Sequence, residues 1–530
     1  MLDILIVGAG GAGLTAALEA HRAGAKVAIL SKSYPTRSQT AMAQGGINAV
    51  LTPSDSIEHH IADTLQSAHD LASIEAITQL CQGAPKAINW LGSLGMPFSR
   101  DTQEGVAQRR LGGASAPRAC YAQDYTGLKL IHTLYDQVIE AGIPLYHEHF
   151  LLNCIVEENH ILGITALDIR TSTVKAIAAK SVILATGGYS KLYGDFSTNA
   201  QGATGDGIAA ALRAGARISD IEFVQFHPTA LASSSILISE SARGAGGLLI
   251  DGEGKRFVDE LAPRDVVARA IYEAIERTGR AYLDIRHLGE AYIEEHLPQE
   301  RKLAQLYEGV DCVHALIPIK PAAHYTMGGI EVDAQGMSAV RGLFAVGECA
   351  NAHIHGANRL GGNSLLELVV FGRDTARHAL TFAQKSTPPN ANDTQFQKDS
   401  AFIHACFHRF TNQIDFYEKQ TFLSKIAYRN AGLFRNEMHL KGVLGVVRQI
   451  QKELPFMGVK DKLSTYNTNL VEFLEFGNII ELAEVLLVGA INRIESRGAH
   501  YRSDYPQSHP HFAHPTISWK EQGVLCNAFE

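Results

Sequence analysis

The sequence predicts an α/β fold in which a discontinuous α/β domain is interrupted by an inserted α+β domain and followed by a helical C-terminal domain. Three observations predict this order. An apolar strand, a glycine-rich turn and an amphipathic helix open the chain. Sequence of similar character returns at 342–367, and a polar segment at 385–395 then precedes a mostly helical third of the chain. We therefore place the discontinuous domain at 1–220 and 334–384, the inserted domain at 221–333, and the C-terminal domain with its tail at 396–530.

The first residues have the pattern strand, tight turn, helix, strand. An apolar run at 2–7 is followed by Gly8, Gly10 and Gly13, which have the spacing of the dinucleotide-binding fingerprint. The first glycine allows the turn, the second lets backbone approach a pyrophosphate, and the third lets helix and strand pack closely. Ser31 ends the second strand, where an acidic residue often binds the ribose of NAD, so the pattern does not favour NAD.

Composition excludes several classes of protein. The 530 residues include 47 basic and 55 acidic side chains, giving a net charge of −8, which does not suit nucleic acid or an anionic membrane surface. The seven cysteines contain no Cys-x-x-Cys pair, so neither a disulfide framework nor a cluster motif is indicated. No apolar run approaches the ~18 residues of a membrane span. We expect a soluble cytoplasmic chain that contacts a membrane only through a partner.

The next elements are expected to surround the cofactor. Residues 31–47 are mostly small and polar and are expected to form a loop that passes along a flat ring. Gly45 and Gly46 have no side chains that would collide with the ring where the backbone comes close to it. Residues 55–94 are mainly helical, and a second glycine turn follows at 109–115. The strand at 181–185 returns the chain to the first sheet, and Asp206 begins another helix, where a carboxylate suits the dipole.

The later segments complete the organisation. At Ser364 and Glu367 the capping-box spacing predicts that a helix begins, with its positive end toward a bound ring. The segment 470–494 is helical and apolar on one side. Three histidines lie in the tail at 506–530, but without a fourth ligand they indicate an ordered surface tail and not a metal site.

Four motifs together resemble one family, the flavoprotein subunits of succinate dehydrogenase and fumarate reductase, with L-aspartate oxidase as a near relative. The motifs are FVQFHPT at 223–229, APRD at 262–265, HYTMGG at 324–329 and HGANRL at 355–360, and the resemblance extends from residue 4 to about 505. It implies a Rossmann-like FAD-binding domain, an inserted capping domain that closes over a dicarboxylate, and a helical C-terminal domain.

The resemblance also implies the cofactor contacts. In most complexes of this family a histidine in the 37–40 loop is bonded covalently to FAD, but this chain has Gln39 there. A carboxamide nitrogen is a poor nucleophile, so we expect non-covalent FAD. The expected FAD-binding residues are Gly8, Gly10, Gly13, Ser31, Lys32, Ser38, Gln39, Thr40, Gly45, Gly46, Asp206, Glu348, Ser364 and Leu365.

The expected chemistry is hydride transfer between a flavin and a dicarboxylate. Arg359 has a fixed fork of donors that suits a carboxylate, and the resemblance places His227, Thr229, Ser239 and His324 around the same substrate. This chain has Ser239 where the family usually has a threonine, and the serine keeps the hydroxyl group. The resemblance implies that Arg264 delivers the proton, relayed through Glu240 and Arg243, which requires a dry site because arginine is a weak acid.

Two further expectations concern direction and partners. Loss of the covalent bond removes an electron-withdrawing substituent, which should lower the flavin potential and favour fumarate reduction over succinate oxidation. Electrons must travel onward, so we expect an iron–sulfur subunit, with a membrane anchor or another electron acceptor, at the cytoplasmic face of the inner membrane.

Two other functions remain open. L-aspartate oxidase also uses non-covalent FAD, but it has a glutamate for the substrate ammonium where this chain has Leu111. A buried ammonium facing leucine would be unpaired and costly. A flavin-bearing structural subunit without turnover is the alternative from another class.

Overall fold

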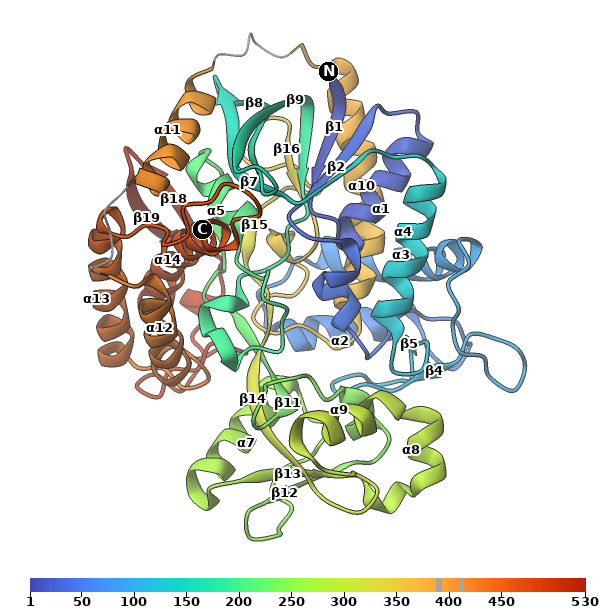
Figure 1. Ribbon diagram of the computed structural model, residues 1–530. Coiled ribbons are helices and arrows are strands. Elements are labelled where there is room, and N and C mark those ends of the chain that lie inside the picture. Colours follow the sequence, from blue (N-terminus) through green and yellow to red (C-terminus); the bar gives the residue numbers. More distant parts are fainter. Residues whose placement is uncertain (388–392, 409–413) are drawn as a thin grey trace.

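A large mixed sheet forms the centre of the upper part of the molecule (Figure 1). The computed structural model describes residues 1–387, 393–408 and 414–530. The strand order is β6-β2-β1-β9-β8-β7, and β16 also pairs with β9. Pairing is parallel from β6 to β9 and between β9 and β16, and antiparallel from β9 to β7. The strands are β1 Leu2–Val7, β2 Val27–Ser31, β6 Leu145–His147, β7 His149–Glu157, β8 His160–Asp168, β9 Thr173–Leu184 and β16 Leu343–Ala345.

Strand β1 contributes to the hydrophobic core on both faces of this sheet. Leu5 and Val7 belong to one core, whereas Ile4 and Ile6 belong to the other. A parallel strand covered on both faces is expected to be apolar throughout, as this one nearly is. Helices cover the second face (Figure 1), namely α1 Gly11–Arg22, α3 Ile74–Ser93, α4 Thr126–Glu140 and α10 Asn363–Lys385, with α2 Ile57–Ala68 packed against α3.

The glycine turn after β1 requires glycine at two places. Gly8 has φ +113°, and a Cβ there would overlap the carbonyl of Ala185. A Cβ at Gly13 would overlap the carbonyl of Gly8, so Gly13 lets α1 pack directly on the turn. The expected sequence of strand, tight turn and helix is confirmed.

Elements between Val224 and Thr326 form a second body, which we call the lower lobe (Figure 1). Its antiparallel sheet has the order β11-β14-β13-β12 and a separate hydrophobic core. Strands β11 and β14 continue into the upper part of the molecule (Figure 1). Its elements are β11 Val224–Leu231, α6 Glu240–Gly244, β12 Leu248–Asp251, α7 Arg264–Thr278, β13 Ala281–Asp284, α8 Glu290–His296, α9 Pro298–Glu308 and β14 Ile317–Thr326.

The C-terminal third is helical, as expected, but its end is not. Its helices are α11 Thr394–His408, α12 Phe416–Asn430, α13 Glu437–Glu453 and α14 Thr468–Asn492. Most positions of α14 are buried, so the one-sided pattern expected for this segment understated its burial. The tail forms strands β18 Thr516–Glu521 and β19 Val524–Phe529, and β18 pairs with β10 Ile218–Ser219. Part of the polar segment expected at 385–395 lies outside the described residues.

The expected capping box at the start of α10 is wrong. The helix begins at Asn363 after Gly362, with no side-chain cap. Glu367 Oε2 instead accepts hydrogen bonds from Tyr325 (2.9 Å) and His355 Nε2 (2.8 Å). The tertiary partners of Glu367 therefore override the local cap.

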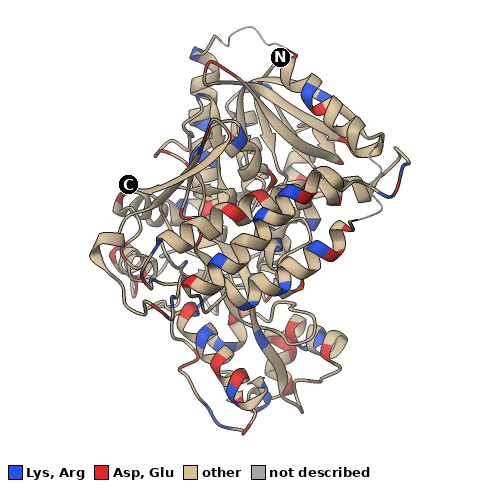
Figure 2. Ribbon diagram, turned by 90° about the vertical axis from the view of Figure 1, so that its left-hand side faces the viewer, with Lys and Arg blue, Asp and Glu red and all other residues tan. Residues whose placement is uncertain are grey.

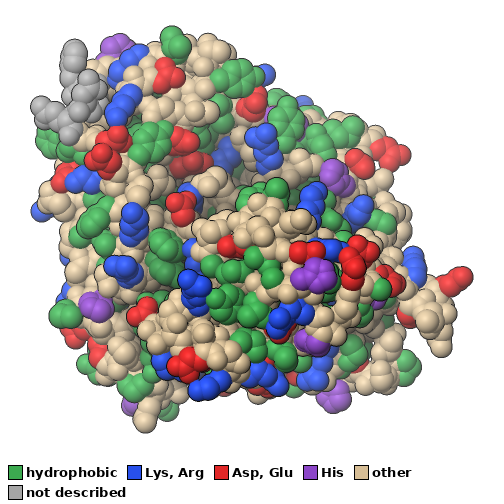
Figure 3. Space-filling model, turned by 60° about the horizontal axis from the view of Figure 1, so that its bottom comes forward, with side chains coloured by type: hydrophobic (Ala, Val, Ile, Leu, Met, Phe, Trp, Pro, Cys, Tyr) green, Lys and Arg blue, Asp and Glu red, His purple; other side chains and the backbone are tan. Residues whose placement is uncertain are grey.

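The surface carries both signs of charge. Basic and acidic residues alternate along the ribbon in Figure 2. In Figure 3 the underside of the molecule shows basic, acidic and hydrophobic side chains mixed. Within the described ranges, none of the helices combines the length and hydropathy needed to cross a membrane.

Candidate active site

One cavity connects the glycine turn of the upper sheet with side chains from the lower lobe. Thirteen of the fourteen predicted FAD residues line it; the exception, Gly13, packs against the turn instead. Thr229 and Arg243 lie behind the lining residues. Of the predicted substrate and proton-relay residues, the cavity is lined by His227, Ser239, Glu240, Arg264, His324 and Arg359.

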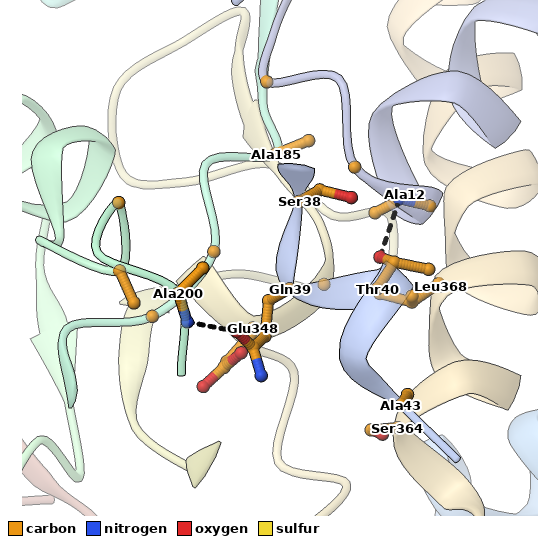
Figure 4. Close-up of a pocket in the computed structure, with 18 of the residues that line it drawn as sticks. Ala12, Ser38, Gln39, Thr40, Ala43, Ala185, Ala200, Glu348, Ser364 and Leu368 are labelled. Atoms are coloured by element: carbon orange, nitrogen blue, oxygen red, sulfur yellow. Dashed lines mark hydrogen bonds between the residues drawn. The ribbon is translucent and has the colours of Figure 1, made fainter. Parts of the chain in front are cut away.

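The glycine-turn end of the cavity has the features that a dinucleotide requires. The N-cap residues of α1 and α10 make no side-chain cap, so the N–H groups of their first turns, apart from those of Gly11 and Asn363, can face phosphate or ring oxygens. The N–H of Gly11 donates to Thr40 Oγ1 (3.0 Å), which fixes the 31–46 loop against α1 (Figure 4). Two buried hydroxyl oxygens, Ser38 Oγ and Thr186 Oγ1, belong to lining residues and have no partner among the described residues. These features fit a bound FAD.

Lys32 links three parts of the chain beside this cavity. Its Nζ donates to Thr204 Oγ1 (2.7 Å), Asp206 Oδ2 (2.6 Å) and Glu475 Oε1 (2.6 Å). Burial lowers the pKa of Lys32, but the two carboxylates outweigh burial and raise it overall. Sequence reasoning missed Glu475, because nothing in the local pattern of α14 indicates a partner more than 440 positions away.

Gln39 occupies the cavity wall with a defined amide orientation. Its Oε1 accepts a hydrogen bond from the N–H of Ala200 (2.8 Å; Figure 4). This bond fixes which end of the amide is the oxygen, so the Nε2 group points away from Ala200. Glu348, which also lines the cavity (Figure 4), accepts from the N–H (2.9 Å) and Oγ1 (3.2 Å) of Thr326. Burial raises the pKa of Glu348 to about 7.

Two histidines meet at the lower-lobe end of the cavity. The ring centroids of His227 and His324 are 4.9 Å apart. Burial and neighbouring arginines lower the pKa of both rings well below the ordinary value, so both are neutral near pH 7. The N–H of Thr229 donates to His227 Nδ1 (3.2 Å), and Thr198 Oγ1 lies 2.7 Å from His324 Nδ1. Each ring therefore has its Nδ1 engaged and its Nε2 available.

Arg359 and Arg264 share one acceptor. Oε1 of Gln225 accepts from Arg359 Nη2 (3.0 Å) and from Arg264 Nη1 (3.1 Å). The Gln225 amide nitrogen donates to Asn358 Oδ1 (2.9 Å) and to the Arg359 carbonyl (2.8 Å). Gln225 was not among the predicted site residues, although it lies within the FVQFHPT motif.

Arg359 is buried with unused donor capacity. Its Nε has no hydrogen-bond partner in the described part of the chain, and its guanidinium lies 4.3 Å from the centre of the Tyr325 ring. Burial and the neighbouring Arg264 lower the pKa of Arg359 to about 10. An anion that enters the cavity can therefore pair with a desolvated guanidinium.

Glu240 connects the predicted relay residues. Its Oε2 accepts from Nε (3.0 Å) and from Nη2 of Arg264, and its Oε1 accepts from the N–H of Gly112 (3.0 Å). Arg243 Nη2 lies 3.6 Å from Glu240 Oε1. Burial raises the pKa of Glu240, but the arginines outweigh it and lower the pKa overall, so Glu240 is ionised. Leu111, next to Gly112, is a buried apolar side chain.

The charges at this end of the cavity are unequal. Arg243, Arg264 and Arg359 carry three positive charges against the one negative charge of Glu240. A dinucleotide cradle beside a buried cationic pocket defines an FAD-dependent oxidoreductase that accepts an anion.

Family models and relatives agree with this class. A model for the FAD binding domain matches residues 3–365, and a model for the fumarate reductase flavoprotein C-terminus matches 420–525. The 8-methylmenaquinol:fumarate reductase flavoprotein subunit of Wolinella succinogenes is 39% identical over 527 residues, covering 95% of this chain and 86% of that protein. The fumarate reductase flavoprotein subunit of Escherichia coli is 37% identical over 95% of this chain and 88% of its own length.

Solved structures show the same likeness. A quinol-fumarate reductase with menaquinol molecules superposes with a TM-score of 0.94 at 35% identity, covering 100% of this chain and 97% of the other. Mycobacterium smegmatis Sdh1 in complex with UQ1 gives a TM-score of 0.88 at 31% identity, covering 100% and 94%. This chain belongs to the family of fumarate reductase and succinate dehydrogenase flavoprotein subunits.

Proposed function

We propose that this chain interconverts fumarate and succinate as a flavoprotein subunit, with the lower lobe acting as the capping domain over the substrate. The observation that carries the proposal is the pair Arg264 and Arg359, held on one oxygen of Gln225 beside two neutral histidines. In such a site Arg359 can bind a carboxylate of the substrate, and Arg264 can transfer the proton. A bound FAD supplies the hydride chemistry.

Arg359 binds one carboxylate of the substrate through its free donors and neutralises its charge. His227 donates from Nε2, because its Nδ1 accepts the N–H of Thr229. His324 donates from Nε2 in the tautomer whose Nδ1 accepts the hydroxyl hydrogen of Thr198. Ser239 adds a hydroxyl, and Thr229 supports this segment through a hydrogen bond from its Oγ1 to the Ile238 carbonyl (2.9 Å). Neutral rings suit this role because each can donate a hydrogen bond to the substrate without first being protonated.

Arg264 gives a proton to the substrate carbon during fumarate reduction. Glu240, which is ionised at rest, first takes a proton from Arg243 and then passes it to Arg264 along their paired hydrogen bonds; a proton from solvent finally restores Arg243. The pKa of Arg243 is lowered by burial, which makes this guanidinium a better proton donor than an exposed arginine. Arg243 Nη1 also donates to the carbonyl of Glu260 (2.6 Å), which fixes its orientation.

FAD is held without a covalent bond, because the amide of Gln39 stands where the family's linking histidine is expected. The hydrogen bond from Ala200 further ties down the Gln39 oxygen. We expect acid precipitation to release all of the flavin into the supernatant. Flavin retained on the washed precipitate would contradict non-covalent binding.

The preferred direction is fumarate reduction, since a flavin without a ring-to-protein bond has the lower potential. A redox titration of the bound flavin checks this. A midpoint above that of the succinate couple would contradict the preference.

The electron partner is an iron–sulfur subunit, with a membrane anchor or another acceptor beyond it, so that the chain lies peripherally at the cytoplasmic face of the inner membrane. The relatives support a partner, since the Wolinella succinogenes protein is named as a subunit and both it and the solved quinol-fumarate reductase are named for a quinol. Anaerobic affinity purification followed by iron analysis tests this. A preparation that reduces fumarate from a quinol without any iron-containing protein would contradict it.

The deciding experiment is anaerobic flavin absorbance of the oxidised protein, titrated with succinate in one cuvette and L-aspartate in another. We expect partial bleaching by succinate and none by L-aspartate, because Leu111 offers no carboxylate to an ammonium group. Bleaching by L-aspartate alone would identify an aspartate oxidase. Bleaching by neither would favour a structural subunit.

A further inference from the structure

Two buried carboxyl groups meet where the lower lobe contacts the segment before α4. Asp124 precedes α4 and Glu300 lies in the first turn of α9, and both have 0% of their surface exposed. Oδ2 of Asp124 accepts the N–H of Gln299 (2.7 Å), so Asp124 caps α9 from another part of the chain. This contact joins the lower lobe to the upper part of the molecule.

Glu300 also contacts the segment that faces the cavity. Its Oε1 accepts the N–H of Ser239 (3.2 Å), and Ser239 lines the cavity. The Ser239 hydroxyl oxygen accepts from the N–H of Ser241 (3.1 Å) in the first turn of α6, so Ser239 caps this helix. That bond uses a lone pair and leaves the hydroxyl hydrogen for an acceptor in the cavity. Glu300 therefore fixes the backbone of a residue whose hydroxyl can donate to a substrate carboxylate.

Each of the two carboxyl groups has one oxygen without a partner. Glu300 Oε2 and Asp124 Oδ1 are buried and make no hydrogen bond within the described residues. Two ionised carboxylates would be costly here, because these oxygens are buried and no donor of the described residues pairs with them. Burial raises the pKa of Glu300 well above its ordinary value, and the charge of Asp124 raises it further. Burial raises the pKa of Asp124 as well.

The surroundings supply one balancing charge. Among the described residues, Arg109 faces both carboxyl groups, and the hydrogen bonds of its guanidinium there go to backbone carbonyls of the loops beside it. Tyr125 and Cys312 also face the pair and are neutral near pH 7, since burial raises the pKa of each. On α9 itself, Arg301 is engaged by Glu290, Glu294 and Asp311. The positive charge of Arg109 balances one ionised carboxylate. The second carboxyl group of the pair is therefore expected to keep its proton.

We propose that Glu300 is a positioning residue that holds Ser239 toward the substrate as an uncharged carboxylic acid, its proton shared with Asp124. Glu300 carries the proton, because the charge of Asp124 raises the pKa of Glu300 beyond what burial alone does. This inference rests on the proposed function, because a second negative charge behind Ser239 matters most when the ligand is a dicarboxylate. Loss of the shared proton would place that charge near the substrate carboxylate and weaken its binding.

The test is the affinity of the full-length, FAD-loaded protein for malonate, a dicarboxylate that cannot be reduced, measured by flavin absorbance from pH 6 to pH 9. Wild-type Kd should rise about tenfold across the range as the shared proton is lost. Glu300→Gln keeps an oxygen for the Ser239 N–H but cannot ionise, so its Kd should lack this tenfold rise and keep only the pH dependence that ionisation of Glu348 adds. Glu295→Gln makes the same change of charge at an exposed position of α8 and should follow the wild type.

Two further readouts separate positioning from stability. Glu300→Ala removes the acceptor and should raise Kd at every pH, whereas Glu300→Gln should restore the low-pH value. The infrared spectrum of the wild type should contain a protonated carboxyl band that is absent from Glu300→Gln and retained in Glu295→Gln.

The outcomes separate this inference from the proposed function. A Glu300→Gln protein whose Kd still rises with pH like the wild type, or whose infrared spectrum equals that of the wild type, would overturn the inference. The infrared band tests the shared proton without any dicarboxylate. Failure of the wild type to bind malonate at every pH would overturn the proposed function instead.

Discussion

The backbone N–H of Gly112 donates a hydrogen bond to Oε1 of Glu240, at 3.0 Å, from the upper part of the molecule to the lower lobe. The other Glu240 oxygen is paired with Arg264. The proposed relay is therefore complete only when the two parts of the molecule are in contact. The glycine is required by space, since a Cβ at this position would overlap Glu240 Oε1.

We expect Gly112→Ala to lower kcat for fumarate by about 10- to 100-fold, because displacement of Glu240 misaligns the proton donor. KM should change much less, since Arg359 is not touched. Steady-state kinetics with an artificial electron donor measures both constants. Gly92→Ala, which adds a methyl group on α3 with no atom within 4 Å, is the control and should leave both constants unchanged. Equal kcat in the wild type and Gly112→Ala would contradict the role of this contact.

Gln225→Leu should weaken dicarboxylate binding, because Arg264 and Arg359 then lose the oxygen that holds their guanidinium groups. Loss of a buried acceptor shared by two charged donors costs about 1–3 kcal/mol, or roughly 5- to 150-fold in affinity. Malonate titration of the flavin absorbance measures the change. The exposed Gln305→Leu on α9 is the control. An unchanged malonate Kd in Gln225→Leu would rule out this positioning role.

Glu475→Gln should weaken FAD binding although the residue lies on α14. The Lys32 ammonium keeps Asp206 and Thr204 but loses one of two carboxylates, so the clamp beside the cavity loosens. We expect a rise in the FAD Kd of about tenfold, measured by titrating FAD-free protein. Glu437→Gln on α13 serves as the control, because it removes a carboxylate from an exposed ion pair, that with Lys441. If both variants bind FAD like the wild type, Glu475 has no part in the cofactor site.

The pKa of Glu348 gives a pH prediction for the FAD-free protein. Its folded pKa of about 7 lies above the ordinary 4.5, so the group is protonated in both folded and unfolded chains below pH 4.5. As pH rises toward 7, the unfolded chain ionises freely while the folded chain resists, and the wild type loses stability relative to Glu348→Gln. Calorimetry at pH 5, 6 and 7 should show the wild-type Tm falling against that of the variant. A constant Tm difference would contradict the raised pKa.

The local pattern was sufficient to predict the first strand, the glycine turn and α1, because each depends on neighbours within a few residues. The resemblance of short motifs to a family named His227, Arg264, His324 and Arg359 as site candidates; the structure brings all four to one cavity, and their roles stay predictions. The capping box at Ser364 failed for the opposite reason: Glu367 has partners in β14 and in the 355 loop that bind it more favourably than the helix start does.

The tertiary structure alone decided the partners across long separations. Nothing near Gln225 in the sequence indicates that it bridges two arginines, one 39 and one 134 positions away. The pairing of tail strand β18 with β10 and the meeting of Asp124 with the start of α9 are of the same kind. The sequence by itself determined which residue types are present and what local structure each segment forms. Burial decided which of these groups became functional partners, because a charge or hydrogen-bond donor removed from water takes its partner from whatever the fold brings within about 3 Å.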